Sequence, residues 1–331
     1  MKYLEDKVEY IEQEPGIEGM FKMMEKAARV CYKTENLIKE GSAHKIIEDV
    51  IIPSGHTSVL EFGTVYLKYK IFQIPKYLKY VFDRYSRVRW RMSGVYVTTT
   101  YRTIMQGDYK DPVEAIQNKF DKDWKSDLEY WCEPTKYHHK RHCFKFIMDR
   151  VGSQSVERHR GVWGISYAQE STRFCNYNQK KFDSNITYSL PSKFYDLIAK
   201  YNKKDIIKRN CREGTPLDMN EWSLEDRLDF LRRCSDEWMI YESALMKAED
   251  SYKLLIDIGW KPEDARGVLN LDVKTEFMMC AYREDWRMWL FRRLDKHAHP
   301  HIRKIAGIVN DYLGIWWTVQ TNQGKIYILT V

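Results

Sequence analysis

Apolar residues recur at helical spacing near the start of the chain. They fall every three or four positions in residues 16–31, so this segment is expected to form an amphipathic helix. Ser42 stands where it would cap a second helix, which we expect to end at the turn-forming residues after Pro53. Apolar and polar residues then alternate, and this pattern predicts a strand over residues 62–72.

Two further segments favour strands before the first strongly basic cluster. Residues 95–104 are rich in β-branched side chains, and residues 143–148 place Phe144 and Phe146 on one face. A short helix is expected to follow over residues 151–160.

The second half of the chain carries several helix signals. Ser223 and Asp226 form a capping box, which predicts a long helix that continues to about Asp257. Gly259 would close this helix, because glycine readily adopts the left-handed conformation of a helix C-terminus. Periodic segments predict three more helices, over residues 262–266, 276–294 and 300–313.

This order of elements favours the α+β class. Strands are expected mainly before helices, whereas a wound βαβ repeat would alternate them. We expect a mixed or antiparallel sheet with a helical bundle. No shift in composition marks a boundary, so residues 1–331 are interpreted as a single domain. A Lys- and Asp-rich run over residues 107–127 is interpreted as a surface insertion.

Composition indicates a soluble globular protein. Of the 331 residues, 44% are apolar and 31% are charged. No apolar run reaches the roughly 18 residues of a membrane span, and the N-terminus has no apolar signal segment. The seven cysteines form no C-x-x-C pair, which favours thiols in a reducing compartment. We therefore expect a cytoplasmic protein with no membrane partner.

The formal net charge of +7 suits an anionic ligand such as a nucleotide, and it equally suits nonspecific nucleic-acid binding. The sequence has no G-x-G-x-x-G after a strand and no G-x-x-x-x-G-K-[ST] loop. A phosphorylated ligand would therefore depend largely on arginines.

Three arginines lie close together in the middle of the chain. Arg158-His159-Arg160 is followed by Gln169-Glu170-Ser171-Thr172-Arg173. The planar guanidinium of arginine binds phosphate oxygens through paired hydrogen bonds, so this segment favours a phosphate with a polar ring. An isolated Arg-His-Arg tripeptide would be better interpreted as the basic end of a helix.

Other polar clusters favour structural interpretations. The segment from His56 to Glu61 is typical of a capped turn. Basic and aromatic residues alternate between Lys76 and Arg91, which fits a nucleic-acid strand or, as we favour, a solvated face with its aromatic residues in the core. The histidines near Pro300 and those before Cys143 lack regular ligand spacing, so no metal is expected.

Taken together and in this order, three segments resemble the flavin-dependent thymidylate synthases. That family carries a G-H-x-[ST]-x-x-E-H turn, then R-H-R-x7-S with an arginine two residues later, then T-x-F … L-R-x-D-x-H-A. The corresponding segments here are Gly55–Phe62, Arg158–Arg173 and Thr275–Ala298. The resemblance runs from about Glu12 to about Arg303, and residues 73–142 resemble an insertion in a longer branch of the family.

The resemblance implies a flavin-dependent thymidylate synthase-like fold and the conversion of dUMP to dTMP. Methylenetetrahydrofolate would supply the carbon, NADPH the reducing equivalents, and FAD would be the bound cofactor of a homotetramer. The implied dUMP site consists of Ser155, Arg158, Gln169, Glu170, Ser171, Thr172, Arg173, Arg266 and Arg293. The implied FAD contacts are His56, Ser58, Glu61, Arg158, His159, Arg160, Tyr282, Glu284 and Met288.

Arg293 is the implied catalytic residue. A fixed cation near N3 and O4 of the uracil ring favours an enolate-like form and so activates C5 for methylation. By this resemblance no cysteine nucleophile is required.

The sequence also departs from the family pattern. Ten residues separate Arg160 from Ser171 where the family has seven, with the insertion at Gly161–Gly164. Phe62 replaces a frequent His, and Ser155 replaces a frequent Gln. In the downstream segment the usual Asn, Arg and Asn are replaced by Tyr282, Glu284 and Met288.

Two alternatives remain open at this stage. A related flavoprotein could modify another pyrimidine nucleotide, for example by hydroxymethylation, through the same arginine contacts. A basic nucleic-acid-binding protein would use the face between Lys76 and Arg91, with salt-sensitive binding and no bound flavin. Under the favoured interpretation, no specific nucleic-acid partner is expected.

Overall fold

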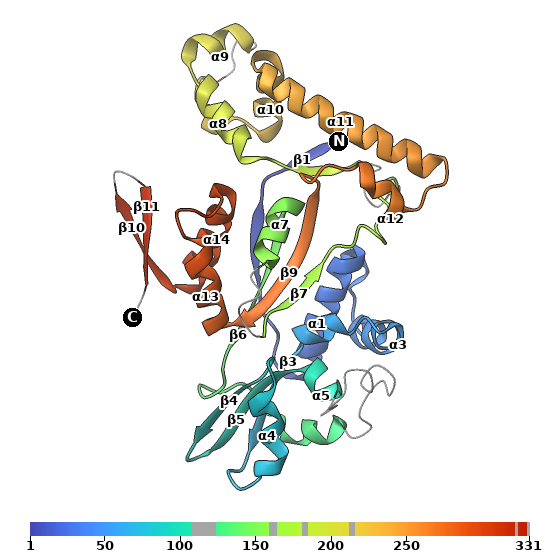
Figure 1. Ribbon diagram of the computed structural model, residues 1–331, viewed down its shortest axis with the longest axis vertical. Helices are drawn as coiled ribbons and strands as arrows, with labels where there is room; N and C mark the ends of the chain where they lie inside the picture. Colours follow the sequence, from blue (N-terminus) through green and yellow to red (C-terminus); the bar gives the residue numbers. More distant parts are fainter. Residues whose placement is uncertain (107–123, 159–163, 181–184, 212–215, 322–323, 330–331) are drawn as a thin grey trace. The chain divides into compact units, whose positions relative to one another are not determined.

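The computed structural model describes residues 1–106, 124–158, 164–180, 185–211, 216–321 and 324–329 (Figure 1). Its chain divides into two compact units, which are described separately. The larger unit contains residues 7–147, 153–171 and 275–331, and the smaller contains residues 1–6, 148–152 and 172–274.

The larger unit is built on a four-stranded sheet. Its strand order is β2-β6-β9-β7, and both β2 with β6 and β7 with β9 pair antiparallel. The strands are β2 (Lys7–Ile11), β6 (Arg141–Asp149), β7 (Ser166–Gln169) and β9 (Lys274–Tyr282).

Helices pack on both faces of this sheet because its strands bury apolar side chains on both sides. Ala168 and Cys280 belong to the same buried cluster as residues of helix α1 (Gly16–Tyr32). On the opposite face, Phe146 stacks on Phe277 with ring centroids 4.8 Å apart. That face also carries the tryptophans of α13 (Arg283–Arg293), and α13 contacts α14 (Pro300–Leu313).

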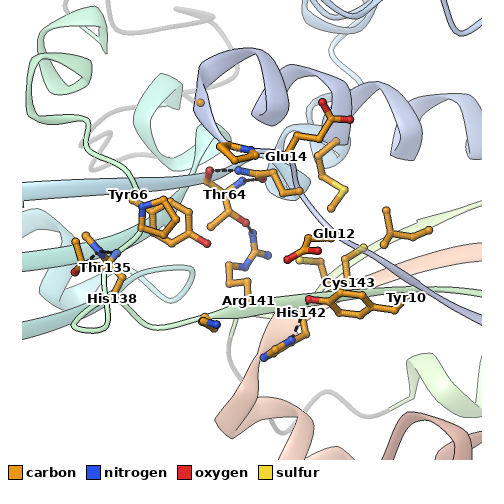
Figure 2. Close-up of a pocket in the computed structure, with 18 of the residues that line it drawn as sticks. Tyr10, Glu12, Glu14, Thr64, Tyr66, Thr135, His138, Arg141, His142 and Cys143 are labelled. Carbon is orange, nitrogen blue, oxygen red and sulfur yellow. Dashed lines mark hydrogen bonds between the residues drawn. The ribbon is translucent and has the colours of Figure 1, made fainter. Parts of the chain in front are cut away.

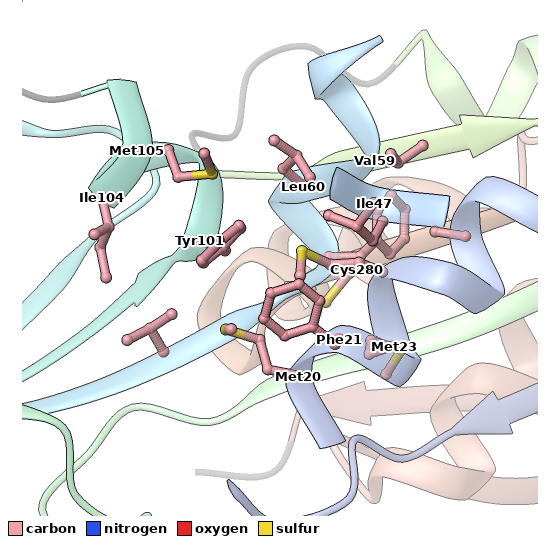
Figure 3. Packing of buried hydrophobic residues seen from close by; sticks show 14 of the residues in the cluster. Met20, Phe21, Met23, Ile47, Val59, Leu60, Tyr101, Ile104, Met105 and Cys280 are labelled. Atoms are coloured by element: carbon pink, nitrogen blue, oxygen red, sulfur yellow. The ribbon is translucent and has the colours of Figure 1, made fainter. Parts of the chain in front are cut away.

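A second sheet of the larger unit has the order β3-β5-β4, with antiparallel pairs throughout. Its core includes Met20, Phe21 and Tyr101 (Figure 3). Gly94, at the start of β5, has φ +141°, and a Cβ there would lie 2.8 Å from the carbonyl oxygen of Tyr69. Only glycine fits this hairpin without displacing backbone. The elements are β3 (Thr64–Tyr69), α4 (Ile74–Phe82), β4 (Arg87–Arg91), β5 (Gly94–Thr100) and α5 (Tyr101–Gln106).

Shorter elements connect these layers. They are η1 (Glu35–Leu37), α2 (Ser42–Ile46), the π-turn η2 (Ile47–Ile51), α3 (Ile52–Ser54), η3 (Thr57–Phe62), η4 (Trp124–Tyr130) and α7 (Arg150–Glu157). A C-terminal antiparallel hairpin consists of β10 (Trp316–Thr321) and β11 (Gly324–Leu329).

The smaller unit is mainly helical. Its strands β1 (Lys2–Leu4) and β8 (Thr187–Ser189) pair in parallel. One buried cluster includes Phe194, Leu231 and Trp238, and a second includes Tyr188 and Tyr252. The other elements are α8 (Ser192–Tyr201), α9 (Lys204–Asn210), η6 (Met219–Glu221), α10 (Leu224–Cys234), α11 (Asp236–Asp257), α12 (Pro262–Ala265) and η7 (Arg266–Val268). Within the described parts of the chain, no helix combines the length and apolarity needed to span a membrane.

The structure confirms the α+β class and most of the expected elements. The helix over 16–31 and the strand over 143–148 are present, and the Ser223–Asp226 capping box is formed. Gly259 closes the long helical region with φ +98°. The run over 107–127 falls mostly outside the described residues.

Four expectations about local structure are wrong. Residues 276–282 continue a strand because their apolar side chains are buried on both sheet faces, so the helix begins at Arg283. Residues 101–104 are helical rather than extended. Ser42 does not cap α2, because its hydroxyl bonds to Glu25 at 2.8 Å and to the carbonyl of Lys39.

The fourth error concerns the helix after Ser223, which is interrupted at Ser235. The buried hydroxyl of Ser235 accepts the backbone N–H of Trp238 at 3.2 Å, so α11 starts with its own cap.

This cap gives a stability prediction. Ser235→Ala should lower the free energy of unfolding by about 1 kcal/mol, because a buried N–H at the start of α11 loses its acceptor. Ser243→Ala is the matched control, since Ser243 is exposed within the same helix and alanine favours helix. Urea unfolding followed by circular dichroism measures both, and equal midpoints for the two variants would contradict the assignment.

Candidate functional site

Two arginines assigned from the sequence come together in the larger unit. Arg158 follows the last residue of α7 and is exposed, and Arg293 is the last residue of α13 and is half-buried. The helices touch, because the indole N–H of Trp289 reaches the carbonyl of Val156 at 3.4 Å. Burial lowers the pKa of Arg293, and the positive charges of Arg292 and Arg158 lower it further. Such a like-charged cluster attracts an anion.

A tyrosine that the sequence did not single out lies near these arginines. The hydroxyl of Tyr167 on β7 is buried and finds no hydrogen-bond partner among the described residues, and neither does Nε of Arg293. Burial and the carboxylate of Glu157 raise the pKa of Tyr167, so its hydroxyl stays protonated. Buried polar groups are normally satisfied, so these two donors are suited to an acceptor on a ligand. A tyrosine in a strand gives no such signal in sequence.

The end of β7 fixes the polar residues that follow the arginine cluster. The amide nitrogen of Gln169 donates to the hydroxyls of Ser153 at 2.7 Å and Thr275 at 3.2 Å. Glu170 is buried, and its carboxylate accepts the backbone N–H of Glu276 at 3.2 Å. The N–H of Ser171 donates to the carbonyl of Cys31 at 3.0 Å. The segment Gln169–Ser171 is therefore fixed by hydrogen bonds to α7, β9 and α1.

Two lysines compensate the buried carboxylates behind this segment. Glu276 pairs with Lys33 at 2.5 Å and with Lys145 at 2.6 Å. Burial lowers the pKa of Lys33, but the carboxylates of Glu276 and Glu170 outweigh burial and raise it. These lysines were not predicted, because each is an ordinary surface-type residue in sequence.

Ser155 of the predicted dUMP set belongs to the larger unit and is half-buried on α7, whereas Thr172, Arg173 and Arg266 lie in the smaller unit. Arg266 donates to the hydroxyl of Thr172 at 2.8 Å and to the carbonyl of Glu263 at 3.0 Å. Arg173 pairs with the carboxylate of Glu263 at 3.6 Å. Arg173 and Arg266 are exposed, so both guanidinium groups can reach a ligand, and Glu263 is a contact that the sequence did not indicate.

The predicted FAD residues divide into exposed and enclosed groups. His56 and Ser58 are exposed, and the His56 ring bonds to the hydroxyl of Tyr32. Glu61 is instead buried and pairs with Arg102. His159 and Arg160 lie outside the described residues.

The downstream FAD residues also divide in this way. Tyr282 is fully buried, and its hydroxyl contacts the carbonyls of Tyr85 at 2.7 Å and Thr98 at 2.8 Å. Glu284 is exposed, and a hydrogen bond with His139 lowers its pKa to about 2. Met288 is exposed. The exposed imidazole of His56, the hydroxyl of Ser58 and the guanidinium of Arg158 suit an anionic cofactor. Glu61 and Tyr282 would contact such a cofactor only after the residues around them had moved.

A cavity of about 810 Å³ lies elsewhere in the larger unit (Figure 2). Tyr10, Tyr66, Arg141 and Cys143 are among its lining residues, and none of the residues predicted to bind dUMP or FAD is. As for metals, no cluster of three potential ligands occurs within the residues that the structure describes.

The family model described as thymidylate synthase complementing protein matches residues 133–314, more than half of the chain. No curated protein matches the chain.

Similar solved structures include the UMP/dUMP methylase PolB from Streptomyces cacaoi. Its complex with 5-Br dUMP is 14% identical, with a TM-score of 0.38, over 94% of this chain and 92% of that chain. Its complex with 5-Br UMP is 15% identical, with the same TM-score, over 94% of this chain and 90% of that chain.

Proposed function

Because the chain belongs to the thymidylate synthase complementing protein family, the flavin-dependent thymidylate synthases, we propose that it methylates dUMP reductively to dTMP. Methylenetetrahydrofolate is the proposed carbon donor, NADPH the reductant and FAD the cofactor. The observation that carries the proposal is the cluster of Arg158 and Arg293 beside the unsatisfied hydroxyl of Tyr167. A homotetramer in the cytoplasm is part of the same proposal.

The proposed dUMP contacts follow the polar groups described above. Arg158 binds the anionic nucleotide, together with Ser155 and the segment from Gln169 to Arg173. Arg266 contributes a further phosphate contact. Guanidinium groups suit this role because they stay charged and bind phosphate oxygens in pairs. The fixed backbone at Gln169–Ser171 supports the proposal, because a pre-ordered segment loses little entropy on binding.

Arg293 is proposed to activate the base. Its guanidinium, half-buried, stabilises negative charge at N3 and O4, which raises electron density at C5. Tyr167 supplies a second donor to the same side of the ring, since its hydroxyl is protonated and no described residue accepts from it. The partial burial of Arg293 strengthens this effect, because charge interactions grow as water is excluded.

FAD is proposed to contact the exposed members of the predicted set. These are His56, Ser58, Arg158, Glu284 and Met288. When bound, the flavin supplies the hydride chemistry, while the protein provides orientation and charge. Glu61 and Tyr282 act in the proposal as supports, because each holds a neighbouring segment in place.

The reaction itself is the first prediction of this proposal. Purified full-length protein given dUMP, methylenetetrahydrofolate, NADPH and FAD should form dTMP, and omission of FAD should abolish the product. Chromatography with mass detection separates dTMP from a hydroxymethylated nucleotide. A hydroxymethyl product would replace the proposed reaction with the alternative one. Salt-sensitive binding to single-stranded DNA without flavin binding or turnover would favour the nucleic-acid interpretation.

Arg293→Ala should lower kcat by about 10²–10³-fold, because a charge-stabilising group at the base is lost. Arg292→Ala is the matched control, since Arg292 is the exposed neighbour on the same helix end and should retain activity. Steady-state kinetics with dUMP measures both variants. Equal losses in the two variants would show a general charge effect rather than a specific role for Arg293.

Tyr167→Phe should lower activity without lowering the stability of the fold. Loss of a hydrogen bond to the base should lower kcat/KM by roughly tenfold, equivalent to about 1.4 kcal/mol. The free energy of unfolding should not fall, because the hydroxyl has no partner within the part of the chain that the structure describes. Tyr188→Phe is the control: its buried hydroxyl donates to the Leu245 carbonyl at 3.2 Å, so it should lose stability and keep activity. Normal kinetics for Tyr167→Phe would remove Tyr167 from the site.

A further inference from the structure

Arg141 carries a buried positive charge. It is 8% exposed and donates to three neutral oxygens: the carbonyl of Glu61 at 2.7 Å, the hydroxyl of Ser166 at 2.8 Å and that of Thr64 at 3.4 Å. Among the residues that the structure describes, its Nε has no acceptor and no carboxylate forms an ion pair with it. The carboxylate of Glu61, whose charge raises the pKa of Arg141, pairs with Arg102 instead. A buried charge without a counterion is costly, so an anionic group beside Arg141 would be stabilised.

Two thiols lie beside this guanidinium. Cys143 is on β6 and Cys280 on the neighbouring strand β9, and both side chains line the same cavity. Cys280 also lies within the buried cluster that contains Phe21 (Figure 3). The two cysteines and Arg141 therefore form a compact group in the larger unit, hereafter the thiol group.

All three members of the thiol group line the cavity of about 810 Å³. Figure 2 shows Arg141 and Cys143 on one strand, with Tyr66 and Tyr10 on either side. Both cysteines are only 2% exposed, so bulky reagents are excluded, while a small molecule that enters the cavity can reach them. The exposed carboxylate of Glu12 also lines the cavity but makes no ion pair with Arg141.

The surroundings distinguish the two thiols chemically. The hydrogen bond with Cys143 lowers the pKa of Cys280, and Arg141 lowers it further against the effect of burial. Burial raises the pKa of Cys143, which keeps its proton. A thiolate beside a cation is the reactive form of cysteine. The titratable and charged groups that interact electrostatically with the thiol pair are Tyr10, Lys26, Glu61, Tyr66 and Arg141.

We propose that the thiol group is a modification site for small hydroperoxides, in which Cys280 is the attacking thiolate and Cys143 the resolving thiol. The Cys280 sulfur attacks the peroxide, the O–O bond breaks, and the departing alkoxide or hydroxide takes the proton that Cys280 has lost. The Cys143 thiol then attacks the sulfenic acid, forming the S–S bond and releasing water. The sulfurs lose two electrons in total, and the peroxide gains them.

The position of the site suits this chemistry. Arg141 would repel a cation such as a soft metal ion. A neutral peroxide is not repelled, and the hydroxide or alkoxide that it releases is an anion that the guanidinium stabilises. The proposal is independent of the dUMP reaction, because none of the proposed nucleotide residues lines the cavity.

Equimolar hydrogen peroxide tests the proposal on the reduced, full-length protein. After the reaction is stopped with iodoacetamide, peptide mass spectrometry should find a Cys143–Cys280 disulfide before any other cysteine is oxidised. Cys175 is the internal control, since it is fully buried and does not line the cavity. It should remain reduced.

Cysteine variants separate the two steps, the attack by Cys280 and the formation of the disulfide. Cys143→Ser should stop at the sulfenic acid, detected as a dimedone adduct on Cys280. Cys280→Ser should leave Cys143 reduced, and Cys175→Ser should form the disulfide as the wild type does.

Arginine variants test the role of charge. At neutral pH, Arg141→Met should slow alkylation of Cys280 by iodoacetamide roughly tenfold, whereas Arg141→Lys should preserve it. Circular dichroism checks the fold, because Arg141 also anchors the Glu61 carbonyl. If Arg141→Met does not fold, the cysteine variants still test the proposed oxidation. Oxidation of Cys211 or Cys234 ahead of Cys280, or no sulfenic acid in Cys143→Ser, would overturn the proposal.

Discussion

The buried carboxylate of Glu276 is the constraint on which the candidate site depends. It is 8% exposed and lies between two lysines, Lys33 at 2.5 Å and Lys145 at 2.6 Å. Its own backbone N–H and C=O bond to Glu170. The carboxylate of Glu276 therefore connects strand β9 with the end of α1 and with strand β6, and its backbone connects β9 with the end of β7. Removing either lysine would leave a buried charge less compensated, which costs more than an exposed pair contributes.

This charge cluster also connects the two candidate arginines. Lys145 lies on β6, which continues into α7 and Arg158, and Glu276 lies on β9, which continues into α13 and Arg293. A one-residue slip between these strands would move Glu276 to the opposite face of the sheet, away from both lysines. The buried pairs therefore fix the strand register, and the register fixes where the helices that carry the arginines begin. Stability contributed by the ion pairs is secondary to this geometric role.

The sequence predicted the arginines but not what surrounds them. Periodicity was sufficient for the helix over 16–31, where one face is apolar and the other polar. It was insufficient for residues 276–282, because a strand buried on both faces has the same continuous apolar pattern as a buried helix. Motif order indicated Arg158 and Arg293, whereas Tyr167 and Lys33 act through contacts with residues distant in sequence, which local patterns do not encode.

Residues 73–142, which the sequence resemblance predicts to be an insertion, contact two of the three positions around α13 at which this sequence departs from the pattern that the resemblance implies. Tyr282 stands where the resemblance implies an Asn, and its hydroxyl contacts the carbonyls of Tyr85 and Thr98, both within residues 73–142. The Arg87 guanidinium lies 4.6 Å from the Tyr282 ring centroid and pairs with the neighbouring Asp285 at 3.2 Å.

Glu284 stands where the resemblance implies an Arg, and it pairs with His139, also within residues 73–142, at 3.3 Å. An arginine at that position would place a second cation beside Arg87 and His139, whereas a glutamate attracts both. Tyr282 and Glu284 therefore suit packing against residues 73–142. Met288 makes none of these contacts, and it is exposed, as is Glu284.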